Sequence, residues 1–231
     1  MYGVSPDGSP VDIYLALPAD PDLQFVRSAV SKRCSVLDLG AGVGRLANPL
    51  ATDGHRVVAV DNSPEMLAHV HGPTTVVADI WSLDLSERFD VVLALSHLVN
   101  SVPRERRIQL LEVCRRHVRD DGRVVVQRHP PTWITVEGRG ELGGVTIHLH
   151  DIERHAEYFA AATTYEVDGQ SWTQRWEAAI VDDVELTALA KATGFTISDQ
   201  LDEAGAWVVL APTIRPQQPN RAPEAQYLLR S

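Results

Sequence analysis

The 231-residue chain lacks most features of disulfide-linked, metal-cluster or membrane proteins. It has only two cysteines, Cys34 and Cys114, and they are not spaced as Cys-x-x-Cys, so neither a disulfide framework nor a zinc cluster is indicated. No run approaches the roughly 18 apolar residues of a membrane span, and residues 1–10 lack a basic segment followed by an apolar one. We therefore expect a cytoplasmic protein with no membrane partner.

Positive charge is scarce as well. The chain has 21 Lys and Arg against 31 Asp and Glu, a formal net charge of −10. Nucleic-acid binding relies on clustered basic residues, so we expect no nucleic-acid partner. The arginines that do cluster, between residues 104 and 119, fall on one predicted helix and are interpreted as its solvent-facing side. The length suits one α/β domain with additions.

The most informative stretch runs from Val36 to Leu46. Its first four residues are an apolar run that predicts a buried parallel strand, and Gly40, Gly42 and Gly44 follow at once. Glycine tolerates positive φ and has no Cβ, so the backbone of such a turn can approach a ligand closely before a helix begins. We expect a small molecule with an adenosine half to bind there.

The spacing of these glycines separates two kinds of nucleotide site. The dinucleotide fingerprint Gly-x-Gly-x-x-Gly requires its third glycine where this chain has Arg45. Asp38, just before the turn, would repel a pyrophosphate but attract an amine or a sulfonium. The pattern favours a ligand with a positive centre and no phosphate. An NAD(P)-dependent oxidoreductase and a glycine-rich turn without a ligand are the less favoured alternatives.

The pattern Asp-x-Gly-x-Gly-x-Gly at residues 38–44 resembles motif I of the class I S-adenosylmethionine-dependent methyltransferases of the small-molecule type. The resemblance implies an α/β fold with a doubly wound, seven-stranded, mostly parallel sheet of the Rossmann-like kind. It also implies S-adenosyl-L-methionine as cofactor and methyl transfer to an oxygen or nitrogen of a small metabolite. A protein of this fold that binds the same cofactor but catalyses a non-methylating reaction, such as a cyclisation, is the alternative.

Two more acidic residues follow at predicted strand ends. Asp61 ends the run 56–61, where a carboxylate can accept hydrogen bonds from both hydroxyls of a ribose. Asp79 ends the next strand; in the resembled family an acid here meets the adenine amino group, although a helix cap is an alternative role. The residues expected to bind the cofactor are Tyr14, Asp38, Gly40, Ala41, Gly42, Gly44, Arg45, Asp61, Asn62, Met66, Asp79, Ile80, Trp81 and Ser96.

The predicted strands at 89–95 and 123–129 supply the candidate catalytic residues. Ligands of open α/β sheets bind at the carboxyl ends of the strands, so His97 and His129 should lie near the reacting group. An unperturbed imidazole titrates near neutrality, so either is a candidate general base; a hydrogen-bonded structural histidine is the alternative. The residues Ser-His-Leu-Val at 96–99 are unlike the Asn/Asp-Pro-Pro-Tyr of methyltransferases that act on base amines or glutamine, which implies a small-molecule acceptor.

The predicted domain layout has three parts. Residues 1–35 form an N-terminal helical lid, residues 36–211 form the methyltransferase domain with an antiparallel β insert at about 144–181 after the fifth strand, and residues 212–231 form a Pro-rich C-terminal tail. Asp168 and Gly169 predict the tip of a hairpin in the insert. Trp172 and Trp176 offer apolar area to an acceptor, to the core or to a second subunit, so a homodimer through the insert or the tail stays open.

One histidine pattern raises a metal question. His148 and His150 occupy alternate positions of a predicted strand, so both imidazoles fall on one face, which a metal ion could use. No cysteine or glycine-bounded ligand set accompanies them. We therefore interpret them as solvent-facing residues and expect no metal.

Overall fold

The computed structural model describes residues 3, 5, 8, 10–30, 32–132 and 136–213, so the predicted tail from residue 214 onward lies outside the described residues. Its centre is a seven-stranded sheet in the order β10-β11-β5-β4-β1-β2-β3. The strands are β1 (Ser35–Leu39), β2 (Arg56–Asp61), β3 (Thr74–Val77), β4 (Phe89–Ala94), β5 (Val118–Gln127), β10 (Phe195–Gln200) and β11 (Trp207–Pro212). Strands β1 to β5 pair in parallel, and β11 lies antiparallel between β5 and β10. The predicted fold class is confirmed.

The central strands are apolar on both faces because both faces are covered. In β1, Leu37 belongs to a core cluster that includes Leu110 and Leu186, whereas Val36 belongs to a second cluster that includes Leu23 and Leu50. Side chains alternate across a strand, so adjacent residues enter different clusters. This double burial explains the unbroken apolar run in the sequence.

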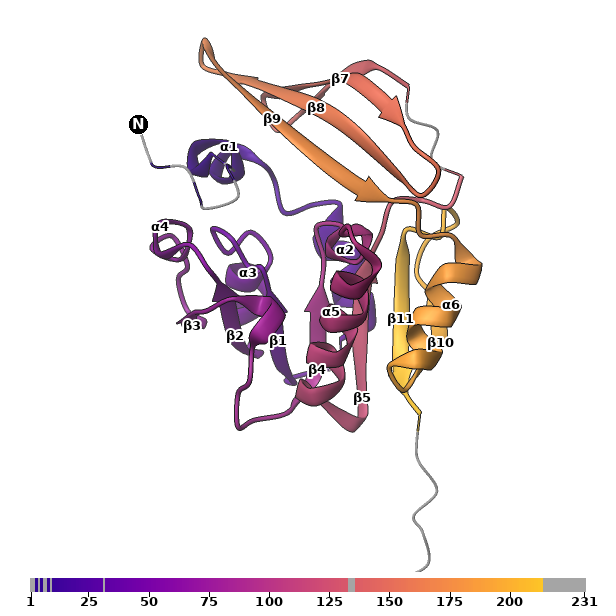
Figure 1. Cartoon of the computed structure of the whole chain (residues 1–231). Coiled ribbons are helices and arrows are strands. Elements are labelled where there is room, and N and C mark those ends of the chain that lie inside the picture. The colour runs from indigo at the N-terminus through magenta and orange to yellow at the C-terminus, as the bar shows by residue number, and fades with distance from the viewer. Residues whose placement is uncertain are drawn as a thin grey trace, which may run out of the picture.

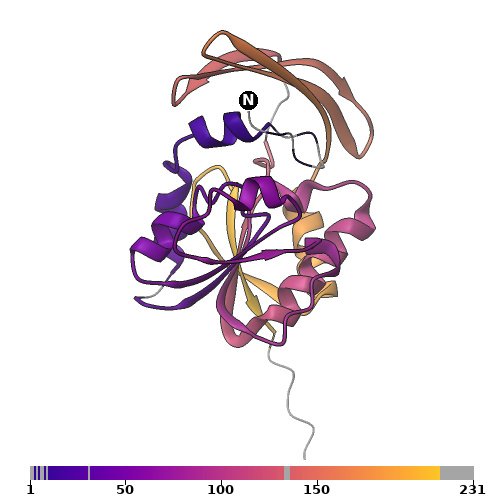
Figure 2. The same cartoon turned by 90° about the vertical axis from the view of Figure 1, so that its left-hand side faces the viewer.

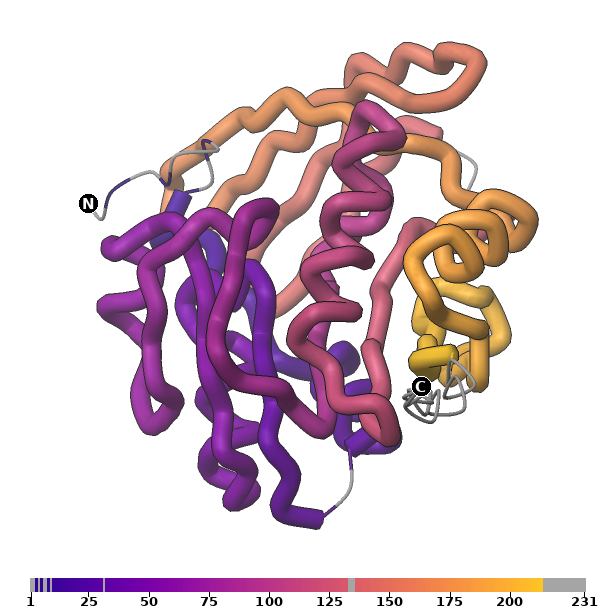
Figure 3. The backbone as a smooth tube through the Cα atoms, turned by 60° about the horizontal axis from the view of Figure 1, so that its bottom comes forward, coloured from indigo at the N-terminus to yellow at the C-terminus, as the bar shows by residue number. Residues whose placement is uncertain are grey.

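Helices cover the two faces of the sheet. They are α1 (Val11–Ala16), α2 (Asp22–Ala29), α3 (Ala47–Thr52), α4 (Pro64–Leu67), α5 (Arg104–His117) and α6 (Asp183–Ala192), with 3₁₀ turns η1 (Ile80–Ser82) and η2 (Leu98–Asn100). Helices α5 and α6 lie side by side (Figure 3), and Arg104 of α5 forms an ion pair with Glu185 of α6 at 2.9 Å. None of the helices in the described ranges has the length and apolarity needed to cross a bilayer.

Two local expectations need correction. A helix that starts directly at Gly44, as the sequence suggests, would contain Pro49 in its interior; α3 instead begins at Ala47, which puts Pro49 in its first turn, where a missing N–H costs no helical hydrogen bond. The arginines of α5 are not all solvent-facing. Arg107 is buried, and its guanidinium donates to the carbonyl of Ser101 at 2.8 Å and to Glu185 at 3.3 Å.

A second, four-stranded antiparallel sheet, the small sheet, arches over the carboxyl ends of the central strands and over α1 (Figures 1 and 2). Its strands are β6 (Gly138–Leu142), β7 (Val145–Arg154), β8 (Tyr158–Val167) and β9 (Gln170–Ala179). The small sheet thus begins before the insert predicted at about 144–181, because residues 138–142 form β6 and Gly143–Gly144 form the turn into β7. In that turn and in Asp168–Gly169 both residues have positive φ, as tight two-residue hairpins require.

Candidate functional site

The glycine-rich turn after β1 is held across the end of β2. The amides of Gly40 and Ala41 donate to the carbonyl of Val60 at 2.8 and 2.9 Å, and the amide of Gly42 donates to Asp61 Oδ2 at 2.8 Å. Gly42 has φ +55°, and a Cβ added to it would meet no atom within 4 Å. The turn therefore exposes bare backbone to open space, as its sequence predicts.

Asp61 is oriented before any ligand binds. Its Oδ2 accepts from Gly42, and its Oδ1 accepts from the amide of Ser63 at 2.9 Å. Ser63 in turn caps α4 by accepting from the amide of Met66 at 3.2 Å. Each carboxylate oxygen has two lone pairs, so each can still accept from a hydroxyl of a ligand.

Asp79 has the helix-capping role considered for it, and its contact with an adenine stays a prediction. Its Oδ1 accepts from the amide of Trp81 at 3.1 Å and so caps η1. The residue also lines the cavity described next. The short 3₁₀ turn places Ile80 and Trp81 on the same wall, and the guanidinium of Arg106 lies 5.1 Å from the centre of the Trp81 ring.

A cavity of about 300 Å³ lies at the carboxyl ends of β1 to β4. Its lining residues are Ser5, Tyr14, Gly40, Gly42, Asp61, Asn62, Met66, Asp79, Ile80, Trp81, Ser96 and Leu98. All but two of these were expected to bind the cofactor. The sequence analysis missed Ser5, for which the sequence carries no signal, and Leu98, whose place in the same loop as Ser96 was a usable signal.

Four predicted cofactor residues do not line this cavity, namely Asp38, Ala41, Gly44 and Arg45. Arg45 binds the N-terminal segment, because its guanidinium donates to Asp22 at 2.6 Å and to the carbonyl of Pro18 at 2.9 Å. Asp38 is 4% exposed. Burial raises its pKa to about 7, an effect that the nearby Arg45 opposes and Asp61 strengthens. Their contact with a cofactor stays a prediction.

The loop after β4 adopts an uncommon backbone. Ser96 and His97 have φ of +52° and +59°, a region that non-glycine residues rarely enter. The Ser96 amide donates to Gln127 Oε1 at 2.9 Å, and the Asn100 amide donates to the carbonyl of His97 at 2.8 Å. Strained backbone of this kind costs roughly 1–3 kcal/mol per residue and gathers at functional sites.

The two candidate catalytic histidines are brought together. Their rings stack with centroids 4.0 Å apart and an interplanar angle of 9°, and the Trp176 ring lies 5.9 Å from that of His129 at 21°. Burial lowers the pKa of His97 to about 4, while Asp22 raises it slightly; burial and the neighbouring His97 lower the pKa of His129 to about 3. Both rings are therefore neutral at pH 7. Such imidazoles are weak general bases, and their catalytic role stays a prediction.

A buried amide joins the histidine loop to the small sheet. Asn100 is 2% exposed; its Oδ1 accepts from the amide of His129 at 3.0 Å, and its Nδ2 donates to the carbonyl of Ala179 at 2.9 Å. The end of β5, the turn η2 and the end of β9 are thus connected by one side chain. Asn100 positions the segments that carry the histidines and Trp176.

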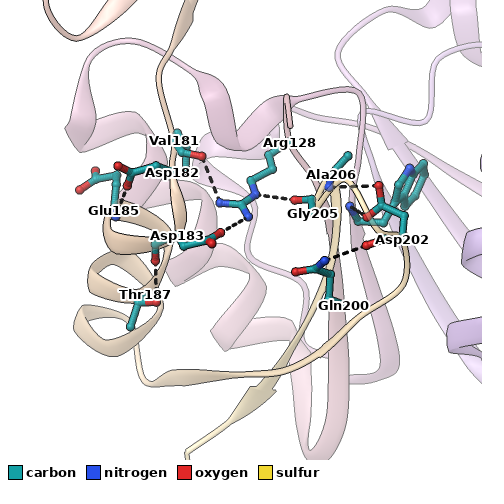
Figure 4. A network of polar contacts seen from close by, with 11 residues as sticks. Arg128, Val181, Asp182, Asp183, Glu185, Thr187, Gln200, Asp202, Gly205 and Ala206 are labelled. Carbon is teal, nitrogen blue, oxygen red and sulfur yellow. Dashed lines mark hydrogen bonds and ion pairs between the residues drawn. The ribbon is translucent and has the colours of Figure 1, made fainter. Parts of the chain in front are cut away.

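Arg128 lies between Gln127 and His129 in the sequence, but its side chain does not point toward the cavity. It is 1% exposed and donates to the carbonyls of Gly205 at 2.7 Å and Val181 at 3.1 Å and to the carboxylate of Asp183 (Figure 4). It secures the segment by which the small sheet returns to the domain. The position of Arg128 just after the end of β5 predicts a side chain that faces the crevice; this prediction is wrong, because buried backbone acceptors surround the guanidinium.

The N-terminal segment and the small sheet approach each other above the cavity. Burial, together with the nearby Tyr14 of α1, raises the pKa of Tyr165 on β8 to about 12. Gly143, in the β6–β7 turn, lies so near that an added Cβ would be 2.6 Å from Pro18 and 2.9 Å from the carbonyl oxygen of Ala16. Tyr14 lines the cavity, and the role of residues 1–35 as a lid stays a prediction.

The histidines of β7 lie on one face of their strand, as expected. The rings of His148 and His150 are 4.9 Å apart, and His150 Nε2 lies 2.8 Å from Thr164 Oγ1. Within the described residues, no group of three or more His, Cys, Asp or Glu side chains is arranged to hold a metal ion. A wider cleft of about 1200 Å³, bounded by α5, α6 and β10, contains none of the predicted site residues.

Comparison with known proteins finds a family match over part of the chain. Residues 36–122 match the family described as methyltransferase domain. A curated relative, carboxy-S-adenosyl-L-methionine synthase of Ectopseudomonas mendocina (strain ymp), is 32% identical over an alignment of 110 residues that covers 40% of this chain and 44% of the relative. The chain thus spans less than half the length of that relative.

Solved structures match nearly the whole chain. The CcbJ methyltransferase from Streptomyces caelestis is 22% identical with a TM-score of 0.70, covering 90% of this chain and 92% of its own. The sugar N-methyltransferase KedS8 from Streptoalloteichus sp ATCC 53650 is 18% identical with a TM-score of 0.69, covering 93% and 96%. CalS10 from Micromonospora echinaspora, solved with S-adenosylmethionine bound, is 19% identical with a TM-score of 0.66, covering 84% and 90%. The fold is therefore shared with these proteins over most of its length.

Proposed function

We propose that this chain, whose residues 36–122 match the methyltransferase domain family, binds S-adenosylmethionine at the carboxyl ends of β1 to β4 and transfers its methyl group to an oxygen or nitrogen atom of a small molecule. The observation that carries the proposal is the single cavity at these strand ends. The Gly42 backbone, the Asp61 carboxylate and the Asp79–Trp81 turn all line it, and they follow strands β1, β2 and β3 respectively.

The residues present fit this cofactor. Asp61 has oxygen lone pairs for two ribose hydroxyls, since only one backbone amide occupies each oxygen. Ile80 and Trp81 offer apolar surface to a purine beside the Asp79 carboxylate. The buried Asp38 carboxyl suits a positive charge nearby, because a cation would favour its ionised form. Among the described residues that line the cavity none is basic, which disfavours the pyrophosphate of a nicotinamide dinucleotide.

When bound, S-adenosylmethionine supplies a methyl group on a positively charged sulfur atom, which an acceptor lone pair displaces. This chain contributes mainly alignment, which is worth roughly 7–11 kcal/mol for well-oriented reactants. The Ser96–His97 loop and His129 flank the space beside the cavity, where neutral imidazoles can accept a hydrogen bond from an acceptor hydroxyl or amine. Tyr14 and the small sheet cover this space and limit the access of water.

Structural relatives support a small acceptor. They include a sugar N-methyltransferase and an amino pentose methyltransferase involved in calicheamicin biosynthesis. The carboxy-S-adenosyl-L-methionine synthase favours a second candidate, in which the chain alters an S-adenosylmethionine-type ligand and methylates no acceptor. Product masses separate the two: methyl transfer adds a methylene-sized increment to an acceptor and releases S-adenosylhomocysteine.

Calorimetry with S-adenosylhomocysteine tests the binding site. We expect Asp61→Ala to weaken binding by about tenfold or more, because hydrogen bonds to a charged group are lost. Asp53→Ala is the matched control, since Asp53 forms its ion pair with Arg27 away from the cavity. Equal affinities for the wild type and Asp61→Ala would contradict the assigned site. A homodimer through the small sheet or residues 212–231 and a cytoplasmic location stay predictions.

A further inference from the structure

The small sheet has one uncharged face and one charged face. Strand register places Val145, Ile147, Leu149, Ala161, Thr163, Tyr165, Trp172, Gln174 and Trp176 on one face, here called the inner face. The opposite, outer face contains Thr146, His148, His150, Ala162, Thr164, Glu166, Thr173, Arg175 and Glu177. Between the β7 bulge and the hairpin turns, the inner face as described has aromatic, aliphatic and neutral polar side chains only.

The inner face is directed toward the cofactor cavity and the His97–His129 pair. Trp176 stacks near His129, and Tyr165 lies close to Tyr14, which lines the cofactor cavity. Figure 2 shows the sheet curving over this end of the domain. Along β9 the exposure alternates strictly, with Trp172, Gln174 and Trp176 half-buried and the residues between them exposed. An acceptor beside the cofactor therefore meets the inner face.

Hydrogen-bonding groups on this surface are present but neutral. The Thr163 hydroxyl accepts from Trp176 Nε1 at 2.9 Å, and the Gln174 amide lies directly opposite Thr163. The two stacked imidazoles are also uncharged at neutral pH, because burial lowers the pKa of each. Together with Trp176 they offer flat π surface and hydrogen bonds but no formal charge.

Basic side chains around the inner face already have partners. Arg45 pairs with Asp22, and on the outer side Arg175 pairs with Asp151. Arg154, beyond the β7 bulge, lies over the ring of Phe159 at 5.0 Å. A phosphate or carboxylate placed under the sheet would lose its hydration without gaining a charged partner, which is strongly unfavourable.

We propose that the acceptor binds with a flat ring against the inner face, beside His97 and His129, and that this part of the acceptor has hydroxyl or amino groups but no phosphate or carboxylate. The inference rests on the proposed function and specifies its substrate class. A sugar ring and an aromatic heterocycle share this chemistry, since both present an apolar ring face with polar groups at the edge.

The test uses two matched pairs of probes with S-adenosylhomocysteine-saturated protein. One pair is methyl glucoside and glucose phosphate; the other is hydroxyquinoline and quinoline carboxylate. Quenching of tryptophan fluorescence, checked by calorimetry, reports binding. We expect the neutral member of at least one pair to bind about tenfold or more tightly than its anionic partner, because the anion is desolvated without a counter-charge.

A matched pair of variants locates the effect. Gln174→Lys puts a cation on the inner face and should reduce or invert the preference for the neutral probe. Thr173→Lys puts the same charge on the outer face and should leave the preference unchanged. Equal or tighter binding of the anionic probes to wild-type protein, no binding of either neutral ring at its highest soluble concentration, or equal effects of the two variants would overturn the inference.

The cofactor titration keeps the two proposals apart. Failure of the wild-type protein to bind S-adenosylhomocysteine would overturn the proposed function. Normal binding of S-adenosylhomocysteine together with a preference for anionic rings would overturn only the inferred substrate class.

Discussion

The imidazoles of His97 and His129 stack at 4.0 Å and within 9° of parallel, although their residues follow two different strands. Parallel strands β4 and β5 are neighbours, so the loops at their carboxyl ends meet. The positive φ of His97 and the hydrogen bond from the His129 amide to Asn100 set the two residues in place. The pair lies beside the predicted cofactor cavity, since Ser96 and Leu98 on either side of His97 line it.

This pair should make stability fall in mild acid. Burial lowers the pKa of both rings from 6.5 to about 4 and about 3, so the unfolded chain takes up protons first as the pH falls. Their contribution to the free energy of unfolding is complete above pH 6.5 and is lost as the pH falls toward about 4. Within this range the free energy of unfolding falls by up to roughly 1.4 kcal/mol per pH unit for each ring. Denaturant unfolding at several pH values should show a shallower decline in His97→Gln/His129→Gln. The exposed-site variant His71→Gln should follow the wild type, and an identical decline in the double variant would contradict the prediction.

The Asp38 carboxylate should lower the stability of the fold and strengthen cofactor binding. Burial raises its pKa from 3.8 to about 7, so its effect on stability has the opposite sign: stability is lost as the pH rises from about 3.8 through about 7. At pH 8 we expect Asp38→Asn to be about 2–4 kcal/mol more stable than the wild type. It should also bind S-adenosylmethionine about tenfold or more weakly, because a carboxylate near the cation is removed. Thermal unfolding and calorimetry measure the two effects; Asp53→Asn is the control, and unchanged affinity would remove Asp38 from the site.

The open space at Gly42 should be essential for the cofactor. A leucine at this position combines a positive φ, which costs about 1 kcal/mol, with a side chain beside the cavity. Gly54 also has positive φ and open space, but it lies at the end of α3 and does not line the cavity. We expect Gly42→Leu and Gly54→Leu to lose similar stability, whereas only Gly42→Leu loses S-adenosylhomocysteine binding by more than about tenfold. Calorimetric retention of binding in Gly42→Leu would argue against the cavity.

Arg128 should contribute strongly to the free energy of unfolding. Arg128→Met leaves the carbonyls of Gly205 and Val181 without their buried donor, and we expect a loss of about 3–5 kcal/mol in the free energy of unfolding. The carboxylate of Asp183 is 76% exposed, so Asp183→Asn should cost less than about 1 kcal/mol. Urea titration of both variants measures the difference. Equal losses would mean that the ion pair, and not the carbonyl contacts, secures this segment.

Local signals predicted most of the framework. Apolar runs marked the buried strands, Gly40, Gly42 and Gly44 marked the turn after β1, and Asp168–Gly169 marked the β8–β9 hairpin. Predictions failed where a distant partner decides the outcome. Strand β6 forms because residues 138–142 pair with β7, although their own composition is that of a loop. Arg107 is buried because Glu185 and the carbonyl of Ser101 lie beside it, which no helical pattern reveals.

The sequence alone determined the glycine turn, the acids at the strand ends and the order of the elements, because these depend on backbone conformation and on the alternation of buried side chains along each strand. Only the tertiary structure decided that Arg45 binds Asp22, that His97, His129 and Trp176 stack, and that the small sheet turns its uncharged face to the site. Those features arise between residues far apart in the chain, where packing and shared hydrogen bonds, and not local propensity, select one arrangement.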